Sequence, residues 1–150
     1  VSYEWESCDI LKTLELYESQ FAKYTKKPGE DLNSILTGIS QPKGRVHIEI
    51  CEPISRMELM KLEQLTSNEY HKAVAHLLDE RINKAYRLYP NNYIAYDLRY
   101  GTRKYQDFYT PQQKEEFLAH VRELEHYDTC DIEMLKDIYL GIYANPVNNK

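Results

Sequence analysis

The chain has 150 residues, a formal net charge of −5 and 29% charged side chains, a size typical of one domain. The acidic balance argues against a nucleic-acid-binding protein, which would carry a basic footprint. No apolar run is long enough to span a bilayer. Three widely spaced cysteines, Cys8, Cys51 and Cys130, form neither a metal-type pair nor a disulfide framework. A reducing, intracellular compartment is therefore expected.

The first 43 residues predict a short strand, one helix and a loop. Apolar and polar residues alternate through Val1–Glu6, which is typical of a strand. A helix is expected to begin near Ile10 with Ser7 or Asp9 as its cap, and its apolar residues recur at helical spacing: Ile10, Leu14, Tyr17 and Phe21. A turn rich in Lys, Pro and Gly ends this helix. Residues 30–43 allow only a short helical turn before a loop.

The strongest strand signal lies in Gly44–Ile54. Val46, Ile48 and Ile50 alternate with polar residues and are β-branched, which favours a half-buried strand. Burial of these side chains is expected to contribute roughly 1.5–3 kcal/mol each, and Pro53 ends the ladder. A single strand is not a sheet. The shortage of other strands therefore suggests that part of the protein is missing.

The second half of the chain predicts helices. Ser55 can cap a short helix over Met57–Leu65, and a capping box then opens the longest helix, Thr66–Tyr89. Turn residues and an aromatic segment follow over 90–100. Two more helices are expected over about 111–125, with Thr110 as cap and Pro111 at the first position, and over about 132–143, ended by Asn145 and Pro146. The predicted fold class is α+β, helix-dominated, with about four to five helices and one or two strands.

One candidate catalytic pair stands in the sequence. His126 and Asp131 have the spacing of a His-x4-Asp pattern, in which a carboxylate can orient an imidazole that deprotonates a hydroxyl. The pattern is weak, because five histidines give several chances of a match. Asp131 is more useful as a helix cap in this position. We therefore interpret the pair as structural.

Other polar residues suggest ordinary structural roles. His71 and His76 are five residues apart on one helix, off the spacing that would let them share a metal, and we interpret them as surface or boundary residues. His47 and Glu49 share one face of the predicted strand as a solvated pair. Gly101–Arg103 could form an anion-binding turn. The simpler interpretation is that these residues only form a loop between two elements.

The segment Ala85–Tyr96 looks like the junction of two tetratricopeptide repeats, which have a 34-residue period. Leu78 and Thr66, however, fall where the repeat requires Ala and Gly. The similarity to a tetratricopeptide repeat is therefore limited to the single turn within Ala85–Tyr96. The chain also carries 14 tyrosines. The tyrosine side chain has an apolar ring and a polar hydroxyl, and therefore suits surfaces that are partly apolar and partly in contact with water. A free-standing helical protein-binding module with a Tyr-rich surface is therefore the alternative interpretation.

Taken in order, the chain resembles the C-terminal part of a bacterial glycerolipid acyltransferase of the lysophosphatidate (1-acyl-glycerol-3-phosphate) type. Val1–Glu6 is similar to the tail of the strand after the family's fourth sequence block, and Gly44–Ile54 to a late strand that ends in a Pro-Ile pair. The helix Thr66–Tyr89 is similar to the one that closes the acyltransferase domain. Tyr89–Asp97 and Tyr143–Pro146 are similar to the tail of a bacterial subgroup.

The resemblance excludes a catalytic role for the residues present. The family's catalytic His and Asp, and the Glu-Gly-Thr-Arg motif that binds glycerol phosphate, would lie upstream of Val1. His126 and Asp131 follow Gly101–Arg103, which reverses the family's order, and Tyr100 replaces the glutamate. No catalytic, cofactor-binding or metal-binding residue of this chain is therefore assigned. We expect a truncated or excised region that is inert alone.

The resemblance implies the organisation and the parent reaction. Residues 1–89 would be the C-terminal portion of the acyltransferase domain of an α/β fold, and 90–150 a helical extension packed on it. The parent would transfer an acyl group from a thioester carrier, acyl-CoA or acyl-carrier protein, to a lysophospholipid hydroxyl, with His as base and no metal or other cofactor. The expected partners are the missing N-terminal catalytic half and a membrane surface, with no nucleic acid. The expected location is cytoplasmic or peripheral at the cytoplasmic membrane.

Overall fold

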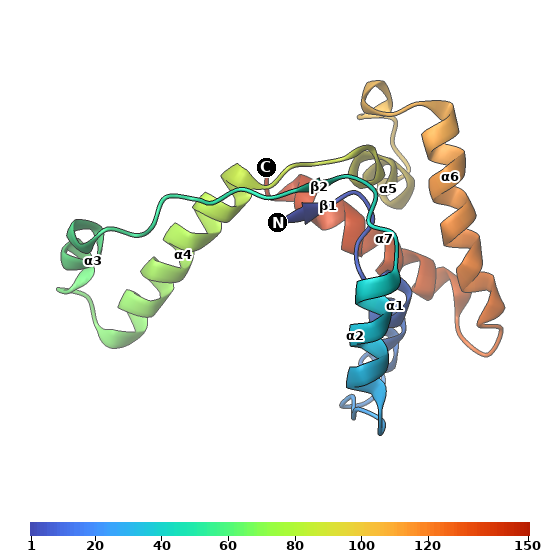
Figure 1. The fold of residues 1–150 in the computed structure, drawn as a ribbon, viewed down its shortest axis with the longest axis horizontal. Coiled ribbons are helices and arrows are strands. Elements are labelled where there is room, and N and C mark those ends of the chain that lie inside the picture. Colours follow the sequence, from blue (N-terminus) through green and yellow to red (C-terminus); the bar gives the residue numbers. More distant parts are fainter.

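A computed structural model describes residues 1–150 as a helical body with one long projection (Figure 1). The α-helices are α1 (Asp9–Glu18), α2 (Glu30–Ser40), α3 (Arg56–Leu62), α4 (Ser67–Ala85), α5 (Pro90–Tyr100), α6 (Pro111–Arg122) and α7 (Ile132–Asn148). Two short 3-10 helices, η1 (Gln106–Phe108) and η2 (Glu123–His126), flank α6. The strands are β1 (Ser2–Tyr3) and β2 (Val46–His47).

The body is organised around α7, the C-terminal helix. It packs most extensively on α5 and next on α1, while α6 packs against α5. Only 18 of the 150 residues are buried, and the apolar core is confined to this group of helices. The core residues come from α5, α6, η2 and α7: Ile94, Ala95, Phe117, Val121, Leu124, Leu135, Tyr139, Tyr143 and Ala144.

A buried carboxylate joins the first helix to the last. Asp9 is 3% exposed and accepts hydrogen bonds from the hydroxyls of Tyr139 at 2.9 Å and Tyr143 at 2.7 Å. The Gln41 side-chain amide donates to the same carboxylate at 3.1 Å. Asp9 therefore holds α1, α7 and the end of α2 together through one buried polar group.

The sheet is a two-residue antiparallel ladder that pairs Ser2 with His47 and Tyr3 with Val46. Gly44 precedes it with φ of 61°, a conformation that favours glycine. A Cβ at this position would lie 2.6 Å from the Glu4 carboxylate, which itself forms an ion pair with Arg45. The close approach of these two segments therefore requires glycine at position 44.

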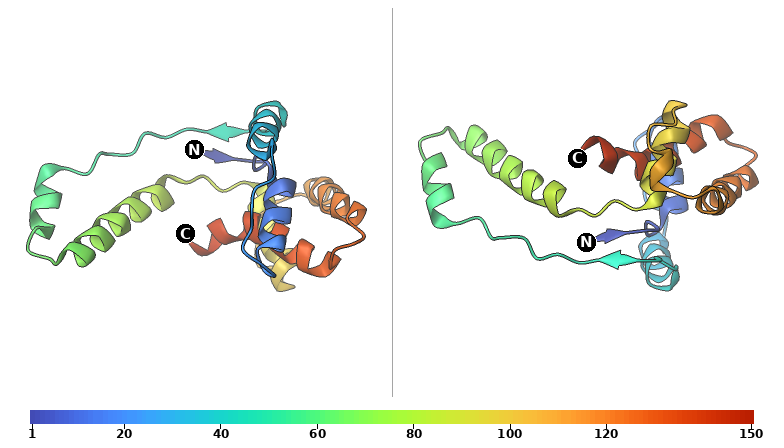
Figure 2. Two further views of the ribbon diagram at one scale, coloured as in Figure 1. Left: turned by 90° about the horizontal axis from the view of Figure 1, so that it is seen from below. Right: turned by 90° about the horizontal axis from the view of Figure 1, so that it is seen from above.

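Residues 48–88 form an arm that leaves the body and returns to it (Figures 1 and 2). An extended segment leads out to α3, and α4 runs back. Arg81 ties the two limbs together, because its guanidinium donates to the Glu52 carbonyl at 2.9 Å and pairs with Glu58 at 2.5 Å. Near the body, the Tyr86 hydroxyl donates to Glu6. The arm is therefore attached only at its base.

The predicted fold class is wrong in its helix number. The chain is helix-dominated with a two-stranded antiparallel sheet, but it has seven α-helices and not four to five. The two unexpected helices are α2, predicted as a turn and a loop, and α5, predicted as a turn followed by an irregular aromatic segment.

Proline explains the error at α5. Pro90 was expected to mark a boundary, but it occupies the first turn of α5, where a missing N–H costs nothing. Asn92 accepts a hydrogen bond from the Tyr89 amide at 2.7 Å and so caps the helix. Gly101, with φ of 62°, ends it. Pro146 likewise does not end α7, which continues to Asn148.

The predicted burial of the main strand is also wrong. Within the predicted strand, backbone pairing with the N-terminal segment stops at His47, and the alternating apolar residues Val46, Ile48 and Ile50 are 48%, 71% and 96% exposed. The reason is that residues 48–54 have no neighbouring strand and make no backbone–backbone hydrogen bond. The pattern of a buried strand is present without the contacts that would bury it.

Candidate functional site

The His126 and Asp131 side chains act separately. The His126 ring nitrogen Nδ1 lies 2.9 Å from the Glu123 carbonyl within η2. Asp131 accepts from the Met134 amide at 3.1 Å and so caps α7, while its own amide donates to the Tyr17 hydroxyl. No hydrogen bond or ion pair joins His126 to Asp131. The geometry gives each residue a local structural role.

The other histidines lie at the surface or its margin. His71 and His76 are exposed on α4, and His76 lies 3.4 Å from Glu80, one turn further along the helix. His47 contacts Glu49 at 3.1 Å. No group of three or more His, Cys, Asp or Glu side chains in the structure is placed to hold a metal ion.

The Gly101–Arg103 turn is organised by a carboxylate. Asp97 is 4% exposed and accepts from the Thr102 hydroxyl at 2.7 Å, the Tyr105 amide at 3.1 Å and the Tyr109 hydroxyl at 2.9 Å. Burial raises the pKa of Tyr109 to about 12, and the Asp97 carboxylate adds to this shift. The buried Asp97 carboxylate already occupies the Thr102 hydroxyl and the Tyr105 amide, so these two donors are not free to bind a second anion.

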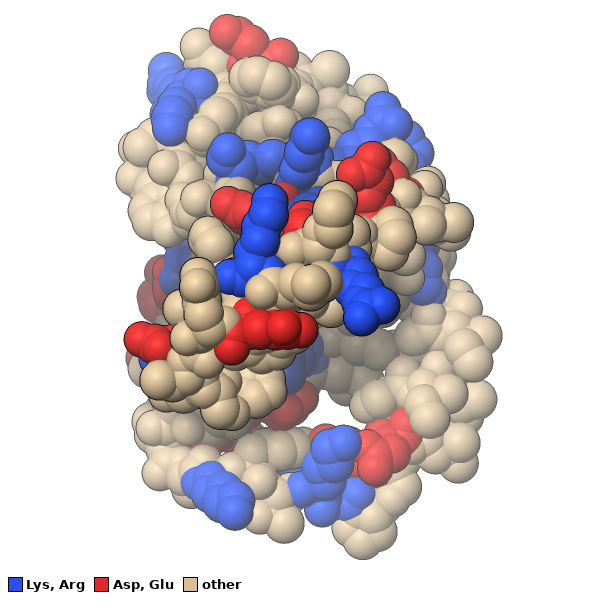
Figure 3. Space-filling view, turned by 90° about the vertical axis from the view of Figure 1, so that its left-hand side faces the viewer, with Lys and Arg blue, Asp and Glu red and all other residues tan.

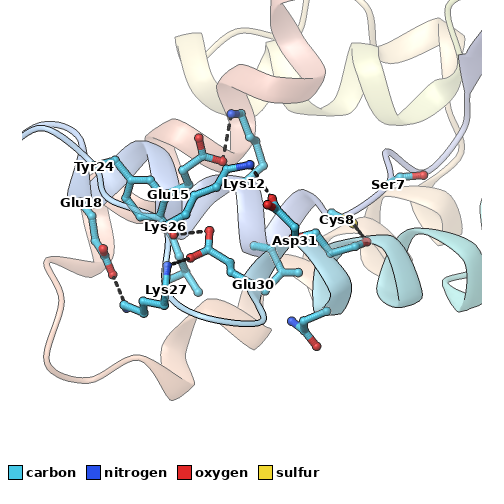
Figure 4. Close-up of a pocket in the computed structure, with 14 residues that line it drawn as sticks. Ser7, Cys8, Lys12, Glu15, Glu18, Tyr24, Lys26, Lys27, Glu30 and Asp31 are labelled. Carbon is cyan, nitrogen blue, oxygen red and sulfur yellow. Dashed lines mark hydrogen bonds and ion pairs between the residues drawn. The ribbon is translucent and has the colours of Figure 1, made fainter.

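A polar cavity of about 430 Å³ lies between α1 and α2 (Figure 4). Its charges are paired with one another: Lys12 with Glu15, Lys26 with Asp31, and Lys27 with Glu18. The Tyr24 hydroxyl donates to Glu30 at 2.5 Å, and this bond raises the pKa of Tyr24 to about 12 and lowers that of Glu30. The Cys8 thiol donates to the Ser34 carbonyl. The cavity therefore offers no activated nucleophile or base.

The feature that stands apart is exposed apolar surface. On α2, four residues at helical spacing form a continuous stripe that is 57–76% exposed: Leu32, Ile35, Leu36 and Ile39. We call these residues the α2 stripe. Amphipathic stripes of this kind normally face a core, yet α2 has no buried residue. The stripe has the chemistry of an interface and not of an active site.

A second exposed apolar element follows α2 directly in the chain. Val46, Ile48 and Ile50 form what we call the open strand, and the backbone of residues 48–54 makes no hydrogen bond to other backbone groups. An unpaired strand exposes donors and acceptors that another strand can use. The α2 stripe and the open strand are thus two exposed apolar elements that follow each other in the chain.

The arm adds apolar side chains without a strong charge. Met57, Met60, Leu78 and Ile82 are exposed on α3 and α4. Figure 3 shows that basic and acidic side chains are interspersed over the face where the arm ends. This face therefore shows no single-sign patch that would attract an oppositely charged macromolecule.

Sequence reasoning missed α2 and the Asp9 cluster. The helical spacing of Leu32, Ile35, Leu36 and Ile39 was a usable signal for α2. The Asp9 cluster had no such signal, because its tyrosines lie 130 and 134 residues away in the chain. Sequence spacing alone does not indicate such a contact.

Searches for related proteins found no matching family model, no similar curated protein and no similar solved structure. Among the helices, none combines the length and apolar character needed to cross a bilayer.

Proposed function

We propose that this chain is the C-terminal part of a glycerolipid acyltransferase of the lysophosphatidate type, in which it packs against the catalytic part of the same protein. Its role there is structural. It adds the open strand and the α2 stripe to the catalytic part, and the catalytic residues come from that other part.

The observation that carries this proposal is the exposure of residues whose pattern is that of a buried strand. Ile48 and Ile50 are 71% and 96% exposed on an extended backbone without backbone partners. Each such side chain gains roughly 1.5–3 kcal/mol when it is fully buried. Addition of the strand to a sheet edge would bury both side chains and satisfy the backbone in one step. The same segment, Gly44–Ile54, carries the resemblance to the family's late strand.

The parent reaction would be acyl transfer from a thioester carrier to a lysophospholipid hydroxyl. A histidine of the catalytic part would remove the hydroxyl proton as general base, and no metal would be required. His126 takes no part in this reaction, because its imidazole is used in the local contact with the Glu123 carbonyl. The isolated chain should therefore show no acyl transfer.

The arm favours a second candidate function, a free-standing helical protein-binding module. Its exposed Met and Leu side chains, among them Met57, Met60 and Leu78, resemble the adaptable surfaces of promiscuous binders. In this case the chain would be stable and monomeric by itself. The acyltransferase proposal instead predicts exposed surface that self-associates.

The test begins with the coding DNA upstream of Val1. We expect an open frame that encodes His-x4-Asp followed by Glu-Gly-Thr-Arg. The complete protein would then be assayed for acyl transfer from acyl-CoA or acyl-carrier protein to lysophosphatidate. The double variant Ile48→Asp/Ile50→Asp should reduce turnover by at least about tenfold, because buried unpaired carboxylates would oppose strand addition.

The control replaces residues on the opposite face of the same segment, His47→Ser/Glu49→Ser, and should retain most of the activity. His126→Ala should also retain it. A start site next to Val1, absence of the two motifs, or loss of turnover in His126→Ala would each refute the acyltransferase proposal. Full activity in the Ile48→Asp/Ile50→Asp variant would refute the strand-addition role.

A further inference from the structure

Aromatic side chains of α5 and of the loop that follows it form a cluster. This loop lies on the side of the body away from α3 at the arm's tip (Figure 1). Five rings lie with centroids 4.6–5.9 Å apart from their neighbours: Tyr93, Tyr96, Tyr100, Tyr105 and Phe108. Phe108 is 57% exposed and Tyr100 48% exposed. The rings thus form a partly exposed aromatic platform with the apolar Phe108 at its surface.

Cationic side chains without carboxylate partners lie beside this platform. Lys104 lies over the rings of Tyr96 and Tyr105, with its Nζ 5.6 and 4.8 Å from their centroids. Arg103 is the adjacent exposed residue. Arg87 and Lys150 line a shallow hollow beside Tyr93.

None of these four cations, Arg87, Arg103, Lys104 and Lys150, takes part in an ion pair, whereas the cations around the α1–α2 cavity are all paired. Two carboxylates lie in the stretch between Arg87 and Thr110, fewer than the four cations. Asp97 is buried and already accepts hydrogen bonds from the loop, and Asp107 is the only other acidic residue between Arg87 and Thr110. The patch is thus locally positive on a chain whose net charge is −5.

We propose that these nine residues, the five rings and the four cations, form a docking surface for an anionic phospholipid bilayer. Tyrosine rings favour the boundary between headgroups and hydrocarbon, because one end of the ring is apolar and the other polar. The exposed Phe108 supplies apolar contact, and the unpaired cations face the phosphate groups. We call this surface the interfacial patch.

The charge and the rings together favour a bilayer over an acidic protein. An acidic partner would require only the cations, whereas an anionic bilayer uses both the cations and the belt of rings around them. No helix here is suited to spanning a membrane, so the contact would be peripheral. The inference does not depend on the acyltransferase proposal, because none of the nine residues belongs to the α2 stripe or the open strand.

The test is co-sedimentation of the chain with vesicles of phosphatidylglycerol and phosphatidylcholine, compared with vesicles of phosphatidylcholine alone. We expect binding to the anionic vesicles that weakens as salt is added. Arg103→Glu/Lys104→Glu should lower the partition coefficient by about tenfold or more, because two attractions become two repulsions. The unmodified chain has one tryptophan, Trp5, so brominated lipid should quench the indole fluorescence of the Phe108→Trp variant more than that of the unmodified chain.

The matched control is Lys61→Glu/Lys72→Glu on the arm, which changes the net charge equally and replaces exposed lysines. It should bind the anionic vesicles nearly as well as the unmodified chain. Equal losses in both double variants, no preference for anionic vesicles, or no quenching in the Phe108→Trp variant beyond that of the unmodified chain would overturn the proposal. It would also be overturned if Ile35→Asp/Ile39→Asp abolished binding while the Arg103→Glu/Lys104→Glu variant bound normally, because the α2 stripe would then be the contact.

Discussion

Asp9 shows how one residue can set the arrangement of three helices. Its carboxylate lies in the core and accepts hydrogen bonds from the hydroxyls of Tyr139 and Tyr143. Burial raises the pKa of both tyrosines, and the Asp9 charge adds to the shift. The two hydroxyls therefore stay protonated and remain donors across the ordinary pH range. The cluster holds α1 against α7 where apolar contact alone would not select one register.

Removal of this carboxylate should be strongly destabilising. Asp9→Ala leaves two buried hydroxyls without their acceptor, and each unsatisfied group costs about 1–3 kcal/mol. We expect the free energy of unfolding to fall by about 2–6 kcal/mol, measured by urea denaturation. Asp31→Ala, which removes an exposed ion pair with Lys26, should change it by less than about 1 kcal/mol. A result for Asp9→Ala as small as that of the control would contradict the structural role of the cluster.

At the scale of the element, the arm depends on a few polar contacts. Glu58 accepts from the Ser55 amide and hydroxyl and pairs with Arg81 of α4. The bonds from Ser55 and then from Arg81 lower the pKa of Glu58 to about 2 from its ordinary value of 4.5. The charged carboxylate therefore caps α3 and links it to α4 at the same time.

The sign of this shift predicts how the arm responds to acid. Because the folded pKa lies below the unfolded one, the contribution is present above about pH 4.5 and is lost as the pH falls towards 2. We expect amide hydrogen exchange in α3 and the first turns of α4 to speed up across this range before the body unfolds. Glu58→Gln should show the fast exchange already at about pH 6, where the wild-type carboxylate is charged. Unchanged protection of α3 in Glu58→Gln would show that the contact does not hold the arm.

At the scale of the whole molecule, two kinds of surface are combined. The body buries a compact core around α7, while α2, the open strand and the arm leave many apolar residues exposed. Monomeric proteins rarely expose contiguous apolar surface of this kind without a binding role. The exposed set is continuous in sequence from α2 into the open strand, which is consistent with one partner covering both.

This surface makes a direct prediction for the isolated chain. It should bind a hydrophobic dye such as anilinonaphthalene sulfonate and elute in size-exclusion chromatography as a self-associated species. Leu36→Glu/Ile39→Glu in the α2 stripe should lower both dye binding and association. Asn33→Glu/Ser40→Glu, which adds the same charge to exposed positions of α2 outside the stripe, should change neither. A compact monomer that binds no dye would favour the free-standing module.

The elements with strong local signals were largely predictable. The capping boxes at Ser55, Thr66 and Thr110 each precede a helix where the sequence predicted one, because the hydrogen bonds involved join residues three apart. Prediction failed at Pro90, because a proline is compatible both with the end of one helix and with the first turn of the next. It failed again for the burial of Ile48 and Ile50, because periodicity indicates which face would be buried and not whether anything covers it.

The sequence by itself determined the helix-dominated character, the acidic balance and the apolar pattern of the strand, since these depend on residues close together in the chain. The tertiary structure alone decided that Asp9 meets Tyr139 and Tyr143, that five rings and four unpaired cations share one edge, and that the α2 stripe faces outward. Those outcomes depend on contacts between distant segments. Local propensity carries no information about such contacts, because they form only when the helices pack.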